Sequence, residues 1–205
     1  MALFSYDDLK RNKTTSSIKT YDALYENHSF KTAGSIKVSD YDSYDIFLSH
    51  SYNDRIIIPA LKAELEAFGY RVYVDWIDDK LLSRDNVSKD TAKILQKRMK
   101  QSKCLIYATS ENSSNSRWMP WELGYFDGIK DKMVGILPIK KYENNFRDDF
   151  KGEEYLGLYY YIDKDTIRGE NKEALWVRES LSKYIIFDAW LNNGLKPTER
   201  GWNNG

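Results

Sequence analysis

The sequence predicts an α/β fold, a flavodoxin-like doubly wound sheet of five parallel strands in the order 2-1-3-4-5 with helices on both faces. From Tyr44 onward, short apolar runs alternate with stretches of helical period, as is typical of a parallel sheet wrapped by helices. The chain has 205 residues, which is long enough to bury one core without disulfides or metals. Five β/α units fit a sheet of this kind.

Each expected strand is an apolar, β-branched or aromatic run bounded by polar residues. The five runs span residues 44–48, 70–74, 103–108, 133–139 and 156–162. The expected helices follow them. One carries a stripe from Ile57 to Phe68 before Gly69, a second spans 87–100 with Asn86 as its cap, and a third starts close to Pro120. Residues 75–85 form a long charged loop, which in a compact domain indicates function or mobility.

The two ends of the chain are less distinctive. Residues 173–191 are expected to form a last amphipathic helix, with a stripe made by Trp176, Leu181, Tyr184, Ile185 and Trp190. Residues 1–41 are polar and carry no motif, so they are left unassigned as an N-terminal extension to a domain of residues 42–205.

Composition narrows the class of partner. Thirty-one basic residues balance thirty-one acidic ones, so we expect no nucleic-acid partner and no membrane partner, and a small specific ligand is favoured. No secretory signal or long apolar span is visible, which predicts a soluble cytoplasmic protein. Cys104 lies in an apolar run and indicates a buried small hydrophobe. With two histidines and one cysteine, we expect no metal site.

The strand order predicts where a ligand binds. In open doubly wound sheets, ligands bind beyond the carboxyl ends of the strands, where the strand order reverses. For the order 2-1-3-4-5 this point lies between the first and third strands, so the loops at 49–54 and 109–118 carry the expected site. Pro120 is tolerated only in a helix's first turn, which places Glu122 at the N-terminal end of the next helix.

Three segments lie in or beside these loops. Residues 44–51 read YDIFLSHS, residues 72–75 read VYVD before the charged loop, and residues 116–123 read SRWMPWEL. They resemble, in order, the first-strand box, the second strand with its BB loop, and the Ser-x-Trp-x-x-x-Glu-Leu motif of the Toll/interleukin-1 receptor (TIR) domain. The resemblance covers about residues 42–140. The fifth strand and last helix, within 155–193, fit the family's layout without a distinctive match.

The resemblance implies an enzyme. In this family the glutamate of the third box marks members that cleave NAD⁺, so Glu122 is expected to be catalytic and NAD⁺ to be a substrate, with no cofactor. The remaining substrate-binding residues implied are Ser49, His50, Ser51, Asp75, Trp76, Lys80, Arg84, Trp118 and Trp121. Bacterial members often serve antiphage signalling of the Thoeris type, which implies a separate effector protein that senses the product. Self-association through TIR–TIR contacts is also implied.

The chemistry of NAD⁺ cleavage agrees with a single carboxylate. Nicotinamide is a cationic leaving group that departs neutral, so no general acid is needed, unlike in ordinary glycosidases. One ionised carboxylate near the ribose stabilises the growing positive charge. A helix N-terminus favours the charged form of Glu122, and the flanking indoles exclude water. Either Trp118 or Trp121 can meet the pyridinium by a cation–π contact of about 0.5 to 2 kcal/mol.

Other readings stay open at this point. A tryptophan and a glutamate four apart on a helix are, by default, a core aromatic beside a solvated acid. His50 is by default a loop hydrogen-bonding group, and Lys80 and Arg84 are solvated charges. Two rival functions are a non-catalytic TIR scaffold and a nucleotide sensor without turnover. Whether water, a ribose hydroxyl, adenine or another acceptor captures the ribosyl cation is left open, so the product is ADP-ribose, a cyclic ADP-ribose isomer or a related signalling nucleotide.

Overall fold

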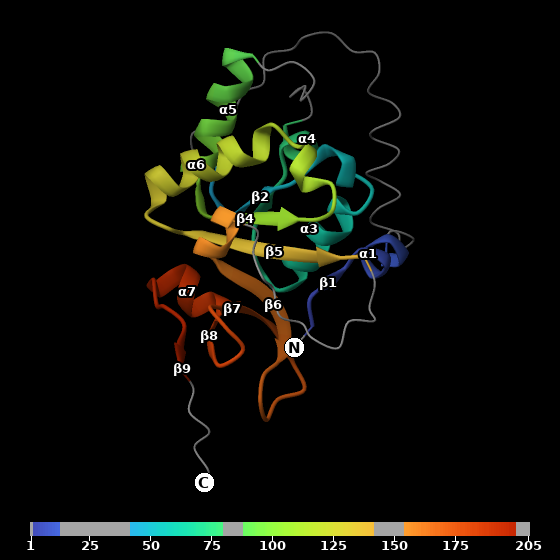
Figure 1. Ribbon diagram of the computed structural model, residues 1–205, viewed down its shortest axis with the longest axis vertical. Helices are drawn as coiled ribbons and strands as arrows, with labels where there is room; N and C mark the ends of the chain where they lie inside the picture. The colour runs from blue at the N-terminus through green and yellow to red at the C-terminus, as the bar shows by residue number, and fades with distance from the viewer. Residues whose placement is uncertain (1, 13–41, 80–87, 142–153, 200–205) are drawn as a thin grey trace.

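The computed structural model describes residues 2–12, 42–79, 88–141 and 154–199. Its centre is a parallel sheet with β2 (Tyr44–Ser49), β3 (Val72–Tyr73), β4 (Ser102–Thr109), β5 (Val134–Lys140) and β6 (Tyr160–Thr166). Their spatial order is β3-β2-β4-β5-β6, and each neighbouring pair is parallel. The predicted order 2-1-3-4-5 is therefore confirmed (Figure 1).

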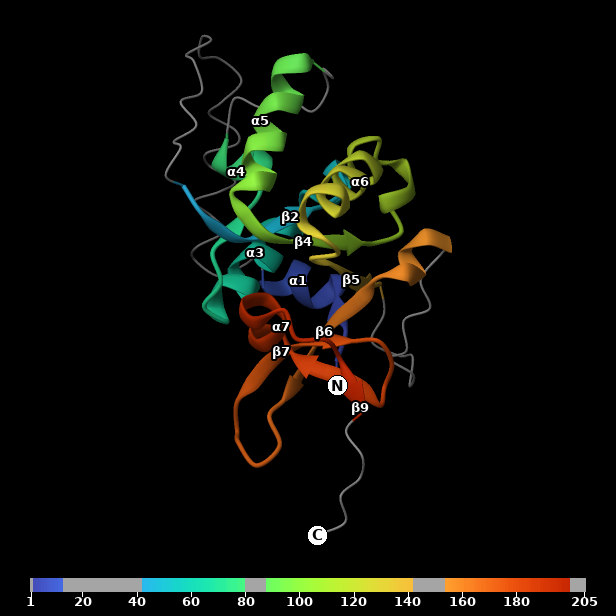
Figure 2. The same ribbon diagram turned by 90° about the vertical axis from the view of Figure 1, so that its left-hand side faces the viewer.

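Helices cover both faces of this sheet, as predicted for a doubly wound fold (Figure 2). One face packs against α1 (Tyr6–Asn12), α3 (Ile58–Ala67) and α7 (Phe187–Asn193), and the other against α5 (Lys89–Lys100) and α6 (Trp118–Lys130). Successive side chains of each strand point to opposite faces of the sheet and so contribute to two hydrophobic cores. In β2, for example, Ile46 and Leu48 face the first set of helices, while Phe47 faces the second.

Beyond β6 the sheet continues with antiparallel strands. Antiparallel strands β7 (Glu173–Arg178), β8 (Lys183–Ile186) and β9 (Thr198–Glu199) extend the edge, and β1 (Phe4–Ser5) pairs with the far end of β5. Residues 2–12, part of the unassigned N-terminal extension, thus pack on the sheet, with Phe4 and Leu9 buried.

The helix predicted over 173–191 is wrong. Two strands and a turn occupy most of it, and a helix begins only at Phe187. Leu175 and Val177 face one core while Trp176 lies on the opposite side of β7, which is a period of two and not of 3.6. Leu181, expected on the buried stripe, is 55% exposed in the turn. The spacing of the apolar residues is compatible with both a helix and a strand, and pairing with β6 makes the segment a strand.

Smaller differences concern element ends. β6 starts four residues later than expected, because η3 (Glu154–Leu158) takes up the first part of the apolar run. Helix α5 begins at Lys89 and not at Val87, since Ser88 accepts a hydrogen bond from the N–H of Thr91. The charged loop opens with one helical turn, α4 (Asp75–Asp78). Within the described residues, no helix is long and apolar enough to span a membrane.

Gly135 marks a close contact between β5 and β6. A Cβ at this position would lie 2.5 Å from Cδ1 and 3.0 Å from Cγ1 of the fully buried Ile162. We expect Gly135→Ala to lower the free energy of unfolding by roughly 1–3 kcal/mol through overpacking. Gly124→Ala, in open space on α6, should raise it by up to about 1 kcal/mol. Urea denaturation measures both, and equal effects of the two substitutions would contradict the packing explanation.

Asp163 is a buried carboxylate on β6. Burial raises its pKa to about 7, although Arg178, whose Nε donates to its Oδ2 over 2.6 Å, opposes the rise. Between its ordinary pKa of 3.8 and about 7, the folded chain holds a proton that the unfolded chain has lost. The free energy of unfolding should therefore fall as pH rises through this window. Asp163→Asn should flatten that slope in urea titrations between about pH 4 and pH 8, and parallel curves for both proteins would refute the assignment.

Candidate functional site

A serine and a glutamate from distant parts of the sequence meet at the carboxyl end of the central strands. Ser49 is the last residue of β2, and its Oγ donates a hydrogen bond of 2.6 Å to Oε2 of Glu122 on α6. Both side chains are fully buried. Ser49 pairs with Tyr107 of the neighbouring β4, so the two atoms lie at the point where strand order reverses. The structure thus brings together two of the predicted site residues.

The sequence of α6 explains why Glu122 lies where it does. The helix begins at Trp118, and Pro120 occupies its first turn, as predicted. Ser116 accepts a hydrogen bond from the N–H of Met119 and helps fix the start of the helix. Glu122 is therefore one turn into α6, pointing toward the end of β2.

Aromatic rings surround the start of α6. Trp118 is 9% exposed and meets Trp121 edge to face at 5.3 Å between ring centroids, and Trp121 stacks on Tyr125 at 5.7 Å. The indole Nε1 of Trp118 is buried and has no hydrogen-bond partner among the residues that the structure describes. Trp121 and Tyr125 are half-buried. Glu122 therefore lies on the same helix as this aromatic, apolar wall.

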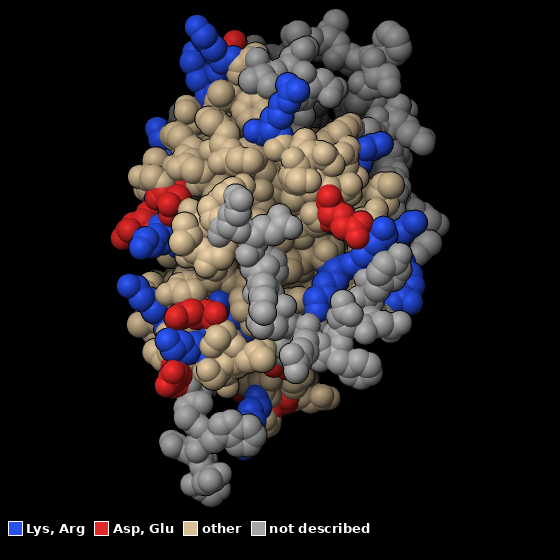
Figure 3. Space-filling model, viewed as in Figure 1, with Lys and Arg blue, Asp and Glu red and all other residues tan. Residues whose placement is uncertain are grey.

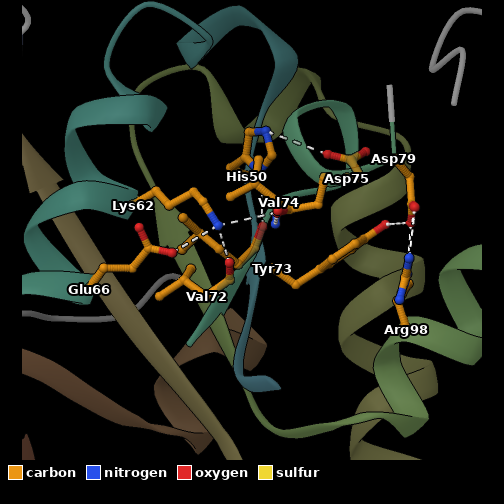
Figure 4. A network of polar contacts seen from close by, with 11 residues as sticks. His50, Lys62, Glu66, Val72, Tyr73, Val74, Asp75, Asp79 and Arg98 are labelled. Carbon is orange, nitrogen blue, oxygen red and sulfur yellow. Dashed lines mark hydrogen bonds and ion pairs between the residues drawn. The ribbon is translucent and has the colours of Figure 1, made fainter. Parts of the chain in front are cut away.

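A second group joins β2 to α4. The Nδ1 atom of His50 lies 2.9 Å from the carbonyl oxygen of Leu48, and the indole N–H of Trp76 donates to His50 Nε2 over 2.9 Å. Because a carbonyl only accepts and an indole N–H only donates, these contacts are both satisfied by a neutral imidazole protonated on Nδ1. Asp75 Oδ1 lies 3.9 Å from the same Nε2. His50, Asp75 and Trp76, all predicted site residues, therefore form one cluster, and Figure 4 shows His50 facing Asp75.

A lysine on helix α3 stabilises the start of α4. Lys62 is buried, and its ammonium group donates to the carbonyl oxygen of Val72 and to Asp78 Oδ2 at 3.3 Å. Asp78 in turn accepts from the backbone N–H of Val74 at 2.7 Å, which satisfies a free donor at the start of the turn. Figure 4 shows Lys62 reaching this backbone from α3.

Helix α5 anchors the end of the same turn. Arg98 donates to both oxygens of Asp79, each over 2.8 Å, and to Asp42 Oδ2 over 2.6 Å. The hydroxyl of Tyr73 donates to Asp79 Oδ2, also over 2.8 Å, and burial raises the pKa of that phenol. Arg98 and Asp79 are nearly fully buried. Residue 79 is therefore a fixed point immediately before residues 80–87.

Two loops at the site are also tied together. Asp54, at the end of η1 (Tyr52–Asp54), accepts from Ser110 and Asn112 in the loop that follows β4. Ser51, a predicted site residue, is buried and caps η1 by accepting from the N–H of Asn53. The sequence offers a local signal for such a cap, since Ser51 and Asp54 match the Ser-x-x-Asp pattern of a helix start. It offers none for the partners of Asp54, more than fifty residues away.

Two of the predicted site residues lie outside the part of the chain that the structure describes. Lys80 and Arg84 lie within residues 80–87, which the described ranges do not include. Among the described residues, no group of three histidine, cysteine, aspartate or glutamate side chains is placed to hold a metal ion. Basic and acidic side chains are interspersed around the uncharged surface on the side where α6 lies (Figure 3), and the described part of this face shows no large field of one sign.

Comparison with known proteins agrees with this geometry. A family model for the TIR domain matches residues 46–177, and the chain therefore belongs to the TIR domain family. It is 48% identical over 194 residues to the probable 3′ cyclic ADP-D-ribose synthase ThsB′ of Bacillus cereus (strain MSX-D12), covering 93% of this chain and 98% of that relative. It is 35% identical over 125 residues to the putative cyclic ADP-D-ribose synthase TIR2 of Cytobacillus dafuensis, covering 60% of this chain and 31% of that relative.

Arg98 carries a stability prediction. Arg98→Met keeps the apolar stem of the side chain and the helix propensity but leaves Asp79 buried without its cation. We expect a loss of about 3–5 kcal/mol in the free energy of unfolding. Lys93→Met on the same helix, whose ion pair with Asp90 is largely exposed, should change it by at most about 0.5 kcal/mol. Chemical denaturation measures both variants, and similar losses in the two would show that burial of the pair is not what matters.

Proposed function

We propose that this chain cleaves the nicotinamide–ribose bond of NAD⁺ and joins the freed ribose carbon to another part of the same molecule, forming a cyclic ADP-ribose isomer. The observation that carries the proposal is the carboxylate of Glu122, fully buried at the switch point and held by Ser49. Its position in the third TIR motif and the names of the two relatives support the same reaction.

The reaction needs little proton transfer at the first step. The bond between the anomeric carbon and the pyridinium nitrogen breaks, its electron pair leaves with neutral nicotinamide, and positive charge develops on the ribose. The negative charge of Glu122 opposes that charge at close range, and the surrounding apolar wall strengthens the field. Ser49 stabilises the ionised carboxylate by donating to Oε2 and fixes its direction. Glu122 therefore acts as a charge stabiliser.

The second step decides the product. A ribose hydroxyl of the same molecule forms a new bond to the anomeric carbon and releases its proton, whereas attack by water gives linear ADP-ribose. The Bacillus cereus relative, which this chain matches over nearly its whole length, is named a 3′ cyclic ADP-D-ribose synthase. This similarity favours a cyclic product with capture by a hydroxyl group.

The remaining predicted residues complete the substrate site in this proposal. Trp118 or Trp121 faces the pyridinium, and His50, Ser51, Asp75 and Trp76 line the rest of the pocket. Lys80 and Arg84 bind the pyrophosphate. NAD⁺ is a substrate here, and the reaction uses no further cofactor.

The biological role follows from the product. A cyclic nucleotide released by one protein acts on a second, so the proposed partner is a separate effector that binds it. We place the chain in the bacterial cytoplasm, in antiphage defence of the Thoeris type, and propose activation through TIR–TIR self-association. A non-catalytic TIR scaffold would use the same contacts without turnover, and the presence of Glu122 favours the enzyme.

Glu122→Gln tests the catalytic role. The amide keeps the shape of the side chain and removes its charge, so we expect nicotinamide release from NAD⁺ to fall by at least about 10²-fold. Chromatography of nicotinamide from concentrated protein measures the rate. Glu179→Gln, at a solvent-exposed position in the turn that follows β7, is the control and should match the wild type.

Two outcomes would count against the proposal. If the wild type releases no nicotinamide even when concentrated or crowded, the scaffold is the better description of the chain. If Glu122→Gln is as fast as the wild type, the carboxylate is not the group that stabilises the ribosyl cation.

A further inference from the structure

Asp54 lies outside the groups assigned to substrate. Its side chain is 1% exposed, and both carboxylate oxygens are occupied by protein donors. Asn112 Nδ2 donates to Oδ1 over 2.6 Å, and Ser110 Oγ donates to Oδ2 over 2.5 Å. A carboxylate engaged on both oxygens by the protein is suited to hold other groups in place.

The two segments it joins are the loops on either side of the switch point. One is the five-residue path from Ser49, at the end of β2, to Asp54 itself. The other leaves β4 at Thr109 and leads through η2 (Ser113–Asn115) to Trp118, where α6 starts. Ser49 comes from the first path and Glu122 from the helix after the second. The separation of the catalytic pair therefore depends on how these loops are held.

The loop after β4 is also stabilised by hydrogen bonds within itself. The N–H of Ser110 donates to Ser113 Oγ over 2.7 Å, the N–H of Asn112 donates to Ser110 Oγ over 3.0 Å, and Ser113 Oγ donates to the carbonyl oxygen of Ala108 over 3.4 Å. A compact, internally bonded loop moves as a unit. Fixing its tip through Ser110 and Asn112 therefore fixes the approach to Trp118.

We propose that Asp54 is a positioning residue that clamps these two loops and thereby favours the cyclic over the linear product. The inference rests on the proposed function. A ribosyl cation is captured by whichever nucleophile is closest and best oriented, and a wall that opens admits water. Holding the loop against η1 keeps the site closed beside Trp118 and Glu122, so that the hydroxyl of the bound nucleotide reacts before water does.

The test compares two substitutions at Asp54. Asp54→Ala removes both acceptors and should release the loop. Asp54→Asn retains the clamp, because its Oδ1 accepts from Asn112 and its amide donates to the oxygen of Ser110. Ser114→Ala, an exposed serine in the same loop, is the matched control. Gly135→Ala, whose added Cβ meets Ile162 in the core on the face of the sheet opposite α6, controls for loss of stability alone.

Two readouts are measured on each variant with NAD⁺ as the probe. Mass spectrometry gives the ratio of cyclic to linear product, and hydrogen exchange gives the opening of residues 109–117 without any turnover. We expect the ratio to fall several-fold in Asp54→Ala and exchange across the loop to rise about ten-fold, while Asp54→Asn, Ser114→Ala and Gly135→Ala stay close to wild type in both.

The possible outcomes separate the clamp from the reaction. Unchanged exchange in Asp54→Ala overturns the clamp, and raised exchange with an unchanged product ratio overturns its role in product choice. A fall in the ratio in Gly135→Ala as well overturns it too, since stability alone would then explain the effect. A wild type that releases no nicotinamide refutes the proposed function, whereas the exchange data still decide whether Asp54 holds the two loops.

Discussion

The free-energy cost of burying carboxylates determines how the candidate site, at the carboxyl ends of the central strands, is held together. Glu122, Asp54 and Asp79 are all at most 4% exposed, and each lies in a segment that follows the carboxyl end of a strand. A carboxylate removed from water must be met by donors, or it destabilises the fold by several kcal/mol. The donors come from other elements: Ser49 from β2, Arg98 from α5, and Ser110 and Asn112 from the loop after β4. Satisfying the charges therefore ties the site together.

Much of this could be predicted because parallel β/α units repeat a simple pattern. Buried strands such as β4 read as apolar runs, and strand order alone places the switch point beside Ser49 and Glu122. Pro120 located the start of α6 to within two residues. These features depend on local sequence or on general topology, so a single sequence contains them.

Other features depend on pairing between distant residues and escaped prediction for that reason. The segment that follows β6 has apolar spacing compatible with a helix, and only its register against β6 makes β7 a strand. Asp54 and Arg98 read as ordinary charges of a loop and a helix. The partners of Asp54 lie 56 to 58 residues away, and the two aspartates bound by Arg98 lie 19 and 56 residues away, so no periodicity connects them. The polar network is thus a property of the folded chain.

Two groups of buried polar contacts lie at the candidate site, one around Glu122 and one around α4. In the proposed reaction Glu122 supplies a negative charge, whose effect depends on its distance from the ribose and on the exclusion of water. The contacts made by Lys62, His50 and Arg98 hold α4 and the Asp79 that follows it. On the two proposals made above, Glu122 sets whether the glycosidic bond breaks, and the loops joined by Asp54 set which nucleophile the ribosyl cation meets first.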